Sequence, residues 1–191
     1  MRLGVLASGK GSNLRNLVER GFEVVAVATN KPTCGAAAFA RERGIPVGEF
    51  SQKRFQSLPD RDAAMRDWLL ARAVDLLVNA GYDRILSGEF IAAFENRMVN
   101  IHPSLLPAFA GGLDAVAQAL ARGVKLSGCT VHLVTEEVDA GPILLQAAVP
   151  VLPDDTIETL HARIQVEEHR ILPLAIEMLE QRIAPARAPL R

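Results

Sequence analysis

The stretch Leu3-Gly4-Val5-Leu6-Ala7-Ser8-Gly9-Lys10-Gly11-Ser12-Asn13 joins a short apolar run to a glycine-rich turn. Residues 3–7 predict a buried strand, and residues 14–20 predict a helix that follows the turn. A helix N-terminus directs backbone N–H groups and the positive end of the helix dipole at one point, which favours a phosphate. A glycine-rich turn without any ligand stays open as the alternative, because tight connections also need glycine for geometry.

Two better-known phosphate motifs are incomplete in this turn. Gly11 stands where a P-loop needs Ser or Thr after its Lys, and Leu14 stands where a dinucleotide fingerprint needs its third glycine. The incomplete fingerprint weakens the interpretation as a dinucleotide-dependent oxidoreductase.

Strands and helices alternate along most of the remaining chain. The expected strands are residues 23–29, 46–48, 75–82, 97–101, 128–134 and 142–151, and the expected helices are 36–43, 63–73, 89–94, 114–122 and 155–183. The segment 135–141 is too short for a crossover helix, so the last two strands should form an antiparallel hairpin. We therefore predict an α/β fold: a doubly wound, mostly parallel Rossmann-like sheet with a C-terminal antiparallel hairpin and a long final helix, in one domain over residues 1–191.

Composition narrows the classes of function. Lys and Arg number 21 against 22 Asp and Glu, which gives a net charge of -1 and no basic surface for nucleic acid. Cys34 and Cys129 lie far apart without zinc-ligand spacing, so we expect neither a metal site nor a disulfide framework. The sequence has no signal-peptide pattern and no apolar run of membrane length, so we expect a cytoplasmic protein with no membrane partner. We expect either a monomer or a homodimer.

A histidine stands at the end of the strand predicted over residues 97–101. Asn100 and His102 are two residues apart, and Pro103 ends the hydrogen-bonding ladder. Ligands of open α/β sheets lie outside the carboxyl ends of the strands, so this pair is well placed for chemistry. The alternative is that both side chains simply cap the strand.

Two further carboxylates are candidates. Asp139 lies in the acidic hairpin loop, and Glu168 falls within the apolar stripe of the final helix, where a charge is costly unless it is paired or faces a ligand. The stripe comprises Ile157, Leu160, Ile164, Leu172, Ala175 and Leu179. Snorkelling or pairing with an arginine is the structural alternative for Glu168.

These groups suit direct transfer of an acyl group to an amine. Asn100 would donate to the growing oxyanion, and His102 would supply a proton or stabilise the charge as imidazolium. A nearby carboxylate would orient the ring of His102 and favour its charged form, and Asp139 is the candidate.

The chain closely resembles the folate-dependent phosphoribosylglycinamide formyltransferases of purine biosynthesis. The resemblance covers nearly the whole length, with motifs in the same order: the turn Ser8 to Asn13, then Asn100-Ile101-His102-Pro103-Ser104-Leu105-Leu106-Pro107, Val138-Asp139-Ala140-Gly141-Pro142 and Gln165-Val166-Glu167-Glu168-His169.

The resemblance implies formyl transfer from 10-formyltetrahydrofolate, as a co-substrate, to the amine of 5'-phosphoribosylglycinamide, without a metal. Asn100, His102 and Asp139 match the family's catalytic residues. Gly11, Ser12, Asn13 and Glu168 match its ribonucleotide-binding residues. The folate-binding residues are matched by Arg61, Asp83, Arg84, Ile85, Leu86, Asn100, Thr135, Glu136, Glu137, Val138 and Asp139.

The chain departs from the family pattern at three places. Asp83 and Asn79 replace residues that are usually apolar, and the turn Phe109-Ala110-Gly111-Gly112 is one residue longer. Two alternative functions remain: a formyltetrahydrofolate hydrolase, in which water replaces the amine, and a non-catalytic module that binds folate and phosphate.

Overall fold

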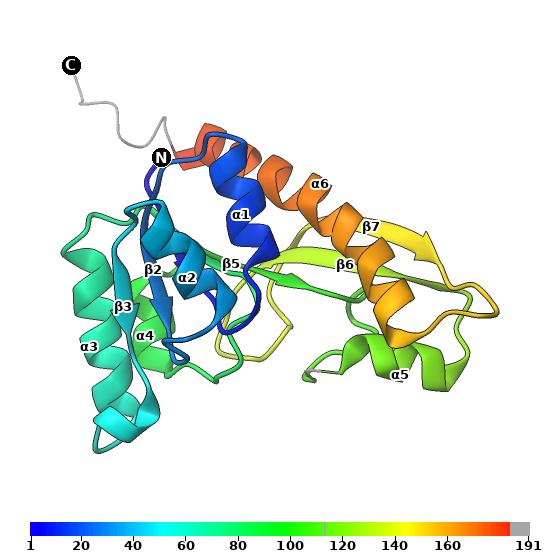
Figure 1. Cartoon of the computed structure of the whole chain (residues 1–191), viewed down its shortest axis with the longest axis horizontal. Coiled ribbons are helices and arrows are strands. Elements are labelled where there is room, and N and C mark those ends of the chain that lie inside the picture. Colours follow the sequence, from blue (N-terminus) through cyan, green and yellow to red (C-terminus); the bar gives the residue numbers. More distant parts are fainter. Residues whose placement is uncertain (113, 184–191) are drawn as a thin grey trace. The chain divides into compact units, whose positions relative to one another are not determined.

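The computed structural model describes residues 1–112 and 114–183 (Figure 1). Its strands form one sheet in the order β3-β2-β1-β4-β5-β6-β7. The strands are β1 (Leu3–Leu6), β2 (Val24–Thr29), β3 (Val47–Glu49), β4 (Leu76–Asn79), β5 (Met98–His102), β6 (Leu126–Leu133) and β7 (Ile143–Pro150). The helices are α1 (Ser12–Glu19), α2 (Gly35–Glu42), the 3-10 turn η1 (Gln52–Arg54), α3 (Leu58–Leu70), α4 (Gly88–Ala93), α5 (Ala115–Arg122) and α6 (Ile157–Ile183).

The sheet is doubly wound. β1 pairs in parallel with β2 on one side and with β4 on the other, and the parallel pairs β2–β3 and β4–β5 extend it in both directions. β6 and β7 are consecutive neighbours in the sheet, joined by the backbone bonds from Leu133 N–H to the Pro142 carbonyl and from Val151 N–H to the Lys125 carbonyl. Because the end of β6 bonds the start of β7 and the end of β7 bonds the start of β6, the two strands run antiparallel. The predicted fold class is confirmed.

Contacts divide the chain into two compact units. The first comprises Met1–Ile101 and His132–Pro142, and the second comprises His102–Val131 and the chain from Ile143 onward. The expectation of a single domain over residues 1–191 stays a prediction.

The first unit has helices on both faces of its strands. α1 packs with α2, which also contacts β2, while α3 packs with α4 (Figure 1). Under α3 and α4 lies an apolar cluster that includes Leu6, Ala26, Ala28, Met65, Leu69, Leu77, Phe90 and Met98. Met65 and Leu69 are buried and Trp68 packs against the same cluster, as the helical spacing predicts.

The second unit is built around α6, which packs on β7 and against α5. The predicted apolar stripe is buried at Leu160, Ile164, Leu172, Ala175 and Leu179. Ile157, the first residue of α6, is 48% exposed, so its assignment to the buried stripe is wrong.

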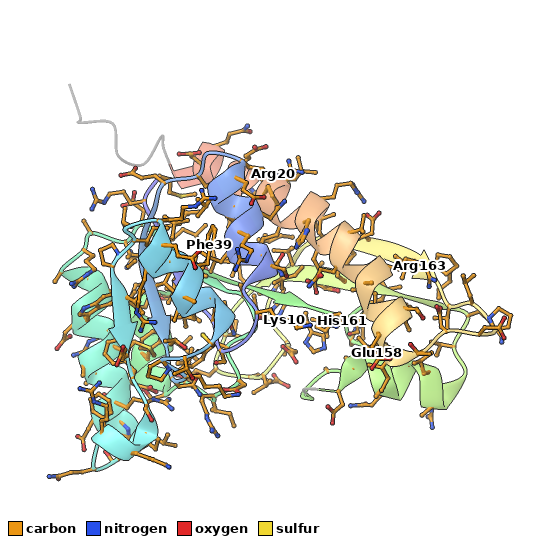
Figure 2. All side chains as sticks on the ribbon, in the orientation of Figure 1. Lys10, Arg20, Phe39, Glu158, His161 and Arg163 are labelled. Atoms are coloured by element: carbon orange, nitrogen blue, oxygen red, sulfur yellow. The ribbon has the colours of Figure 1, made fainter. Side chains whose placement is uncertain are left out.

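The predicted starts of α3 and α6 are also wrong. α3 begins at Leu58 rather than residue 63, because Ser57 caps it and accepts a hydrogen bond from Asp60 N–H. α6 is capped by Thr156 and Thr159, whose hydroxyls accept reciprocal bonds from each other's N–H, and not by Asp155 with Glu158. Asp155 instead forms a bidentate ion pair with Arg163, which Figure 2 labels on α6.

No helix in the described part of the chain has both the length and the apolar composition that a bilayer crossing requires.

Candidate active site

Asn100 and His102 lie on β5, two residues apart. Alternate residues of a strand face the same side of the sheet, so both side chains leave β5 in the same direction. Asn100 is half-buried and lies opposite Asn79 in the parallel pair β4–β5, while His102 is 6% exposed. The strand ends at His102, directly before Pro103, as predicted.

The amide of Asn100 is held between two side chains of the hairpin segment in the first unit. Its Nδ2 lies 3.3 Å from Asp139 Oδ1 and 3.1 Å from His132 Nε2. His132 Nδ1 lies 2.9 Å from the Leu133 carbonyl, which can only accept, so Nδ1 carries the proton and Nε2 accepts from Asn100. Both hydrogens of the Asn100 amide are therefore directed at acceptors, and the amide orientation is fixed.

His132 was not among the residues singled out from sequence. It is 2% exposed, and its Nε2 lies 3.6 Å from Asp139 Oδ1, so it contacts the Asn100–Asp139 pair from β6. The sequence offered one signal for His132, a polar ring placed after Cys129 and Val131 on a predicted strand, and both of those residues are buried. Its partners lie 32 and 7 residues away, and no local pattern reveals the first of them.

The hairpin loop places Asp139 through a constrained backbone. Asp139 has a φ of 55°, in the left-handed region that Asp tolerates better than most residues. At Gly141, an added Cβ would meet the Leu133 carbonyl oxygen, so only glycine allows this approach. Strained backbone of this kind concentrates at functional sites. Thr135, whose hydroxyl bonds the Glu137 carbonyl, further shapes the loop.

His102 belongs to the second unit and is oriented by its own downstream loop. Its Nε2 lies 3.2 Å from the Phe109 carbonyl, so Nε2 carries a proton. Phe109 has a φ of 60°, and the Ser104 hydroxyl donates to the Ala108 carbonyl at 2.5 Å. These contacts fold residues 102–109 back on themselves and fix the ring.

The glycine-rich turn of the first unit leads into a helix as predicted, but α1 begins at Ser12, two residues before the predicted start at Leu14. Gly11 has a φ of 79°, in the left-handed region that favours glycine, and a Cβ there would lie 2.7 Å from Ala36 Cα. Both the backbone conformation and the close packing therefore require glycine. Gly11, the N-cap residue of α1, makes no side-chain capping bond, and the first turn of α1 contains no acidic residue. Ser12 and Asn13 begin the helix, and Lys10 is exposed on the turn (Figure 2). An uncapped helix start beside an exposed cation suits an anion.

The segment 83–88 of the first unit is fastened by a buried ion pair. Arg61 and Asp62 are 0% and 1% exposed and bond each other at 2.6 Å. Arg61 Nη2 also donates to the Ile85 carbonyl, and Asp62 Oδ2 accepts from Ser87 N–H. Arg61 thus holds the backbone of this segment.

The other residues assigned to folate differ in exposure. The side chain of Ile85 is 77% exposed and that of Val138 is 55% exposed, whereas Leu86 packs against the apolar cluster. Arg84 is exposed, with Nε 3.7 Å from Asp83 Oδ1. The Glu136 carboxylate lies against Gly88, at the start of α4, where an added Cβ would be 2.9 Å from Oε1.

Glu168 lies on α6 in the second unit and is 5% exposed, so the prediction that it is buried is confirmed. It lies near Cys129: burial and the charges of Glu168 and Glu167 raise the pKa of the Cys129 thiol to about 12. Within residues 1–112 and 114–183, no three His, Cys, Asp or Glu side chains are grouped so as to hold a metal ion.

Comparison with known proteins adds independent information. A family model described as formyl transferase matches residues 1–176. The chain is 47% identical over 186 residues to phosphoribosylglycinamide formyltransferase of Mycobacterium tuberculosis, covering 93% of this chain and 84% of that protein. It is 46% identical, with a TM-score of 0.91, to the crystal structure of glycinamide ribonucleotide transformylase 1 from Symbiobacterium toebii, covering 95% of this chain and 89% of that one.

A longer relative is the trifunctional purine biosynthetic protein adenosine-3 of Bos taurus. The identity is 42% over 184 residues, which cover 93% of this chain but only 18% of the bovine protein. The chain therefore matches one part of that protein.

Proposed function

This chain belongs to the phosphoribosylglycinamide formyltransferase family, and on that premise we propose that it transfers the formyl group of 10-formyltetrahydrofolate to the amine of 5'-phosphoribosylglycinamide in purine biosynthesis. The observation that carries the proposal is the Asn100 amide held by Asp139 and His132 at the end of β5. An amide fixed in this way is a preorganised donor for an oxyanion.

In the proposed reaction, the amine nitrogen attacks the formyl carbon and a C–N bond forms. The carbonyl oxygen takes up negative charge in a tetrahedral intermediate. The bond from this carbon to N10 of the folate then breaks, and the proton lost by the amine is returned to N10. The protein has to stabilise the oxyanion and move one proton.

Asn100 is the proposed oxyanion donor. An oxyanion is a stronger acceptor than a neutral imidazole, so it would take the hydrogen that Asn100 otherwise gives to His132. Asp139 would keep the second hydrogen and the amide orientation. His102 is the proposed proton carrier, because its ring is held through Nε2 and its basic nitrogen is then Nδ1.

The ribonucleotide would be bound through its two ends. The uncapped start of α1, with Gly11, Ser12 and Asn13, suits the phosphate. Glu168, a buried carboxylate on α6, suits the cationic or hydrogen-bonding glycinamide end. We assign the folate to Asn100, to residues 83–86 with Arg61 behind them, and to residues 135–139.

The proposed substrates are small molecules. The balanced composition, with 21 basic and 22 acidic residues, supports a protein that acts without nucleic acid or membrane. We further propose a cytoplasmic monomer or homodimer whose chemistry needs no metal.

Steady-state kinetics test the function. Purified protein should release tetrahydrofolate from 10-formyltetrahydrofolate only when the ribonucleotide is present. His102→Ala should remove most of this release, because the proposed proton carrier is lost. Release of equal rate without the ribonucleotide would instead establish a hydrolase. A folded protein that binds both compounds without release would be a binding module.

A further inference from the structure

Three polar side chains of the first unit form a closed ring of hydrogen bonds. The Ser8 hydroxyl donates to Asn30 Oδ1 (2.5 Å), and the Asn30 amide donates to Asp83 Oδ1 (2.8 Å). The backbone N–H of Asp83 donates back to Ser8 Oγ (3.1 Å). Since each member donates and accepts, the Ser8 hydroxyl and the Asn30 amide each have a single satisfied orientation.

The ring joins the carboxyl ends of three neighbouring strands. Ser8 follows β1, Asn30 follows β2 and Asp83 follows the turn after β4. Ser8 and Asn30 are 6% and 9% exposed, so loss of a partner would leave buried polar groups unpaired.

The Asp83 carboxylate also binds a cation. Its Oδ2 lies 2.5 Å from Lys31 Nζ, while Oδ1 faces Asn30. Burial on its own raises the pKa of the Asp83 carboxyl, but the bonds from Lys31 and Asn30 outweigh it and hold that pKa below the ordinary value. The carboxylate is therefore ionised at neutral pH, and both of its oxygens are engaged.

The ring reaches both substrate segments of the proposed function. Ser8 opens the phosphate turn, and its N–H also donates to the Gly81 carbonyl. The next residue, Gly9, accepts from Ala36 N–H, which ties the turn to the first residues of α2. Asp83 opens residues 83–86, which we assign to folate. A shift of either segment must therefore strain or break the ring.

We propose that Asp83 is a positioning residue that couples the phosphate turn to the folate segment, so that the ribonucleotide and the folate each raise the affinity for the other. This inference rests on the proposed function. Coupling of this kind is reciprocal, and commonly amounts to about fivefold or more in affinity.

Calorimetry measures the coupling directly. The dissociation constant of tetrahydrofolate is determined with and without saturating glycinamide ribonucleotide, and their ratio is the coupling factor. The wild-type protein should give a factor of about five or more. Asp83→Leu removes the bonds of the Asp83 side chain to Asn30 and Lys31 but keeps the backbone bond from Asp83 N–H to Ser8, so it should lower the factor toward one.

Two more conservative variants distinguish a loss of coupling from a loss of the folded structure. Asp83→Asn keeps an acceptor for the Asn30 amide and loses the ion pair with Lys31, together with the longer, exposed contact to Arg84. Lys31→Met deletes the ion pair between Lys31 and Asp83 from the other side. Both should give the same intermediate factor, and the double variant should fall no further. Asp67→Asn, which removes an exposed pair with Arg66 on α3, is the matched control and should keep the wild-type factor.

The outcomes are distinguishable. A wild-type factor near one, or an unchanged factor in Asp83→Asn and Lys31→Met, would overturn the inference while leaving formyl transfer intact. If the wild-type protein bound neither compound, the proposed function itself would fail and the inference with it.

Discussion

Both hydrogens of the Asn100 amide are engaged, because one is directed at Asp139 and the other at His132. Asn100→Asp would replace a donor by a carboxylate beside Asp139 Oδ1, where the present separation is 3.3 Å. We expect kcat to fall about 100- to 1000-fold, the loss typical of a missing oxyanion donor. Steady-state kinetics on the folded variant measure it.

Asn79→Asp is the matched control for Asn100→Asp. Asn79 Oδ1 accepts from Tyr82 N–H at 3.1 Å, and an aspartate keeps that acceptor. Its kcat should stay at the wild-type value. Equal losses in the two variants would mean that charge at this edge of the sheet, rather than the oxyanion donor, governs the rate.

Tyr82 carries a buried hydroxyl whose oxygen has no hydrogen-bond partner in the part of the chain that the structure describes. Tyr82→Phe removes that group and should raise the free energy of unfolding at pH 7 by about 1 kcal/mol. Denaturant titration measures the change. A lower free energy of unfolding in the variant would mean that the hydroxyl makes a stabilising bond.

The same residue predicts a pH dependence. Burial raises the pKa of the Tyr82 phenol from 10.0 to about 12, against an opposing effect of the Arg61 charge. A pKa raised in the folded state stabilises the fold below the unfolded value and loses that contribution as pH rises toward 12. Wild-type stability should therefore decline more steeply than that of Tyr82→Phe as pH rises from 10.0 to about 12, the interval between the unfolded and folded pKa values of Tyr82.

At the scale of single elements, α3 depends on a cap at its first turn. Ser57 Oγ accepts from Asp60 N–H at 3.2 Å and donates to the Asp60 carboxylate at 2.7 Å. Ser57→Ala should lower the free energy of unfolding by about 1 kcal/mol. Ser51→Ala is the control, because Ser51 precedes η1 without a side-chain capping bond. An equal loss in both variants would contradict the capping role.

Comparing the helices and strands with the sequence shows which local signals were sufficient to predict them. The order of strands and helices was predictable, because apolar periodicity and glycine turns are local. The start of α3 was missed because Ser57, Pro59 and Asp60 look like a polar loop, although a Ser followed three residues later by an acidic residue is a capping pattern.

The residues of the candidate site also divide into those that a local sequence pattern reveals and those that it does not. Asn100 and buried Glu168 were identifiable because each interrupts an apolar pattern, and Asp139 was identifiable because it lies in an acidic hairpin loop. His132 and the ring through Asn30 were not, because their partners lie 32 and 53 positions away along the chain. Such pairings are set by sheet topology, which brings distant strand ends to one edge.

At the scale of the whole molecule, topology explains why polar residues gather. β2, β1, β4 and β5 are consecutive parallel strands of one sheet, so their carboxyl ends share an edge. Asn30, Ser8, Asp83 and Asn100 all lie at those ends. Ligands of doubly wound sheets bind outside this edge, which is where the proposed function places both substrates.

The fate of a labelled formyl group shows directly whether the protein transfers it to the amine. Protein, 10-formyltetrahydrofolate labelled with carbon-13 in the formyl group and glycinamide ribonucleotide are combined, and the products are separated by mass spectrometry. We expect the label on the ribonucleotide amine, in amounts equal to the tetrahydrofolate released. Label appearing as formate, with the ribonucleotide unlabelled, would contradict this expectation.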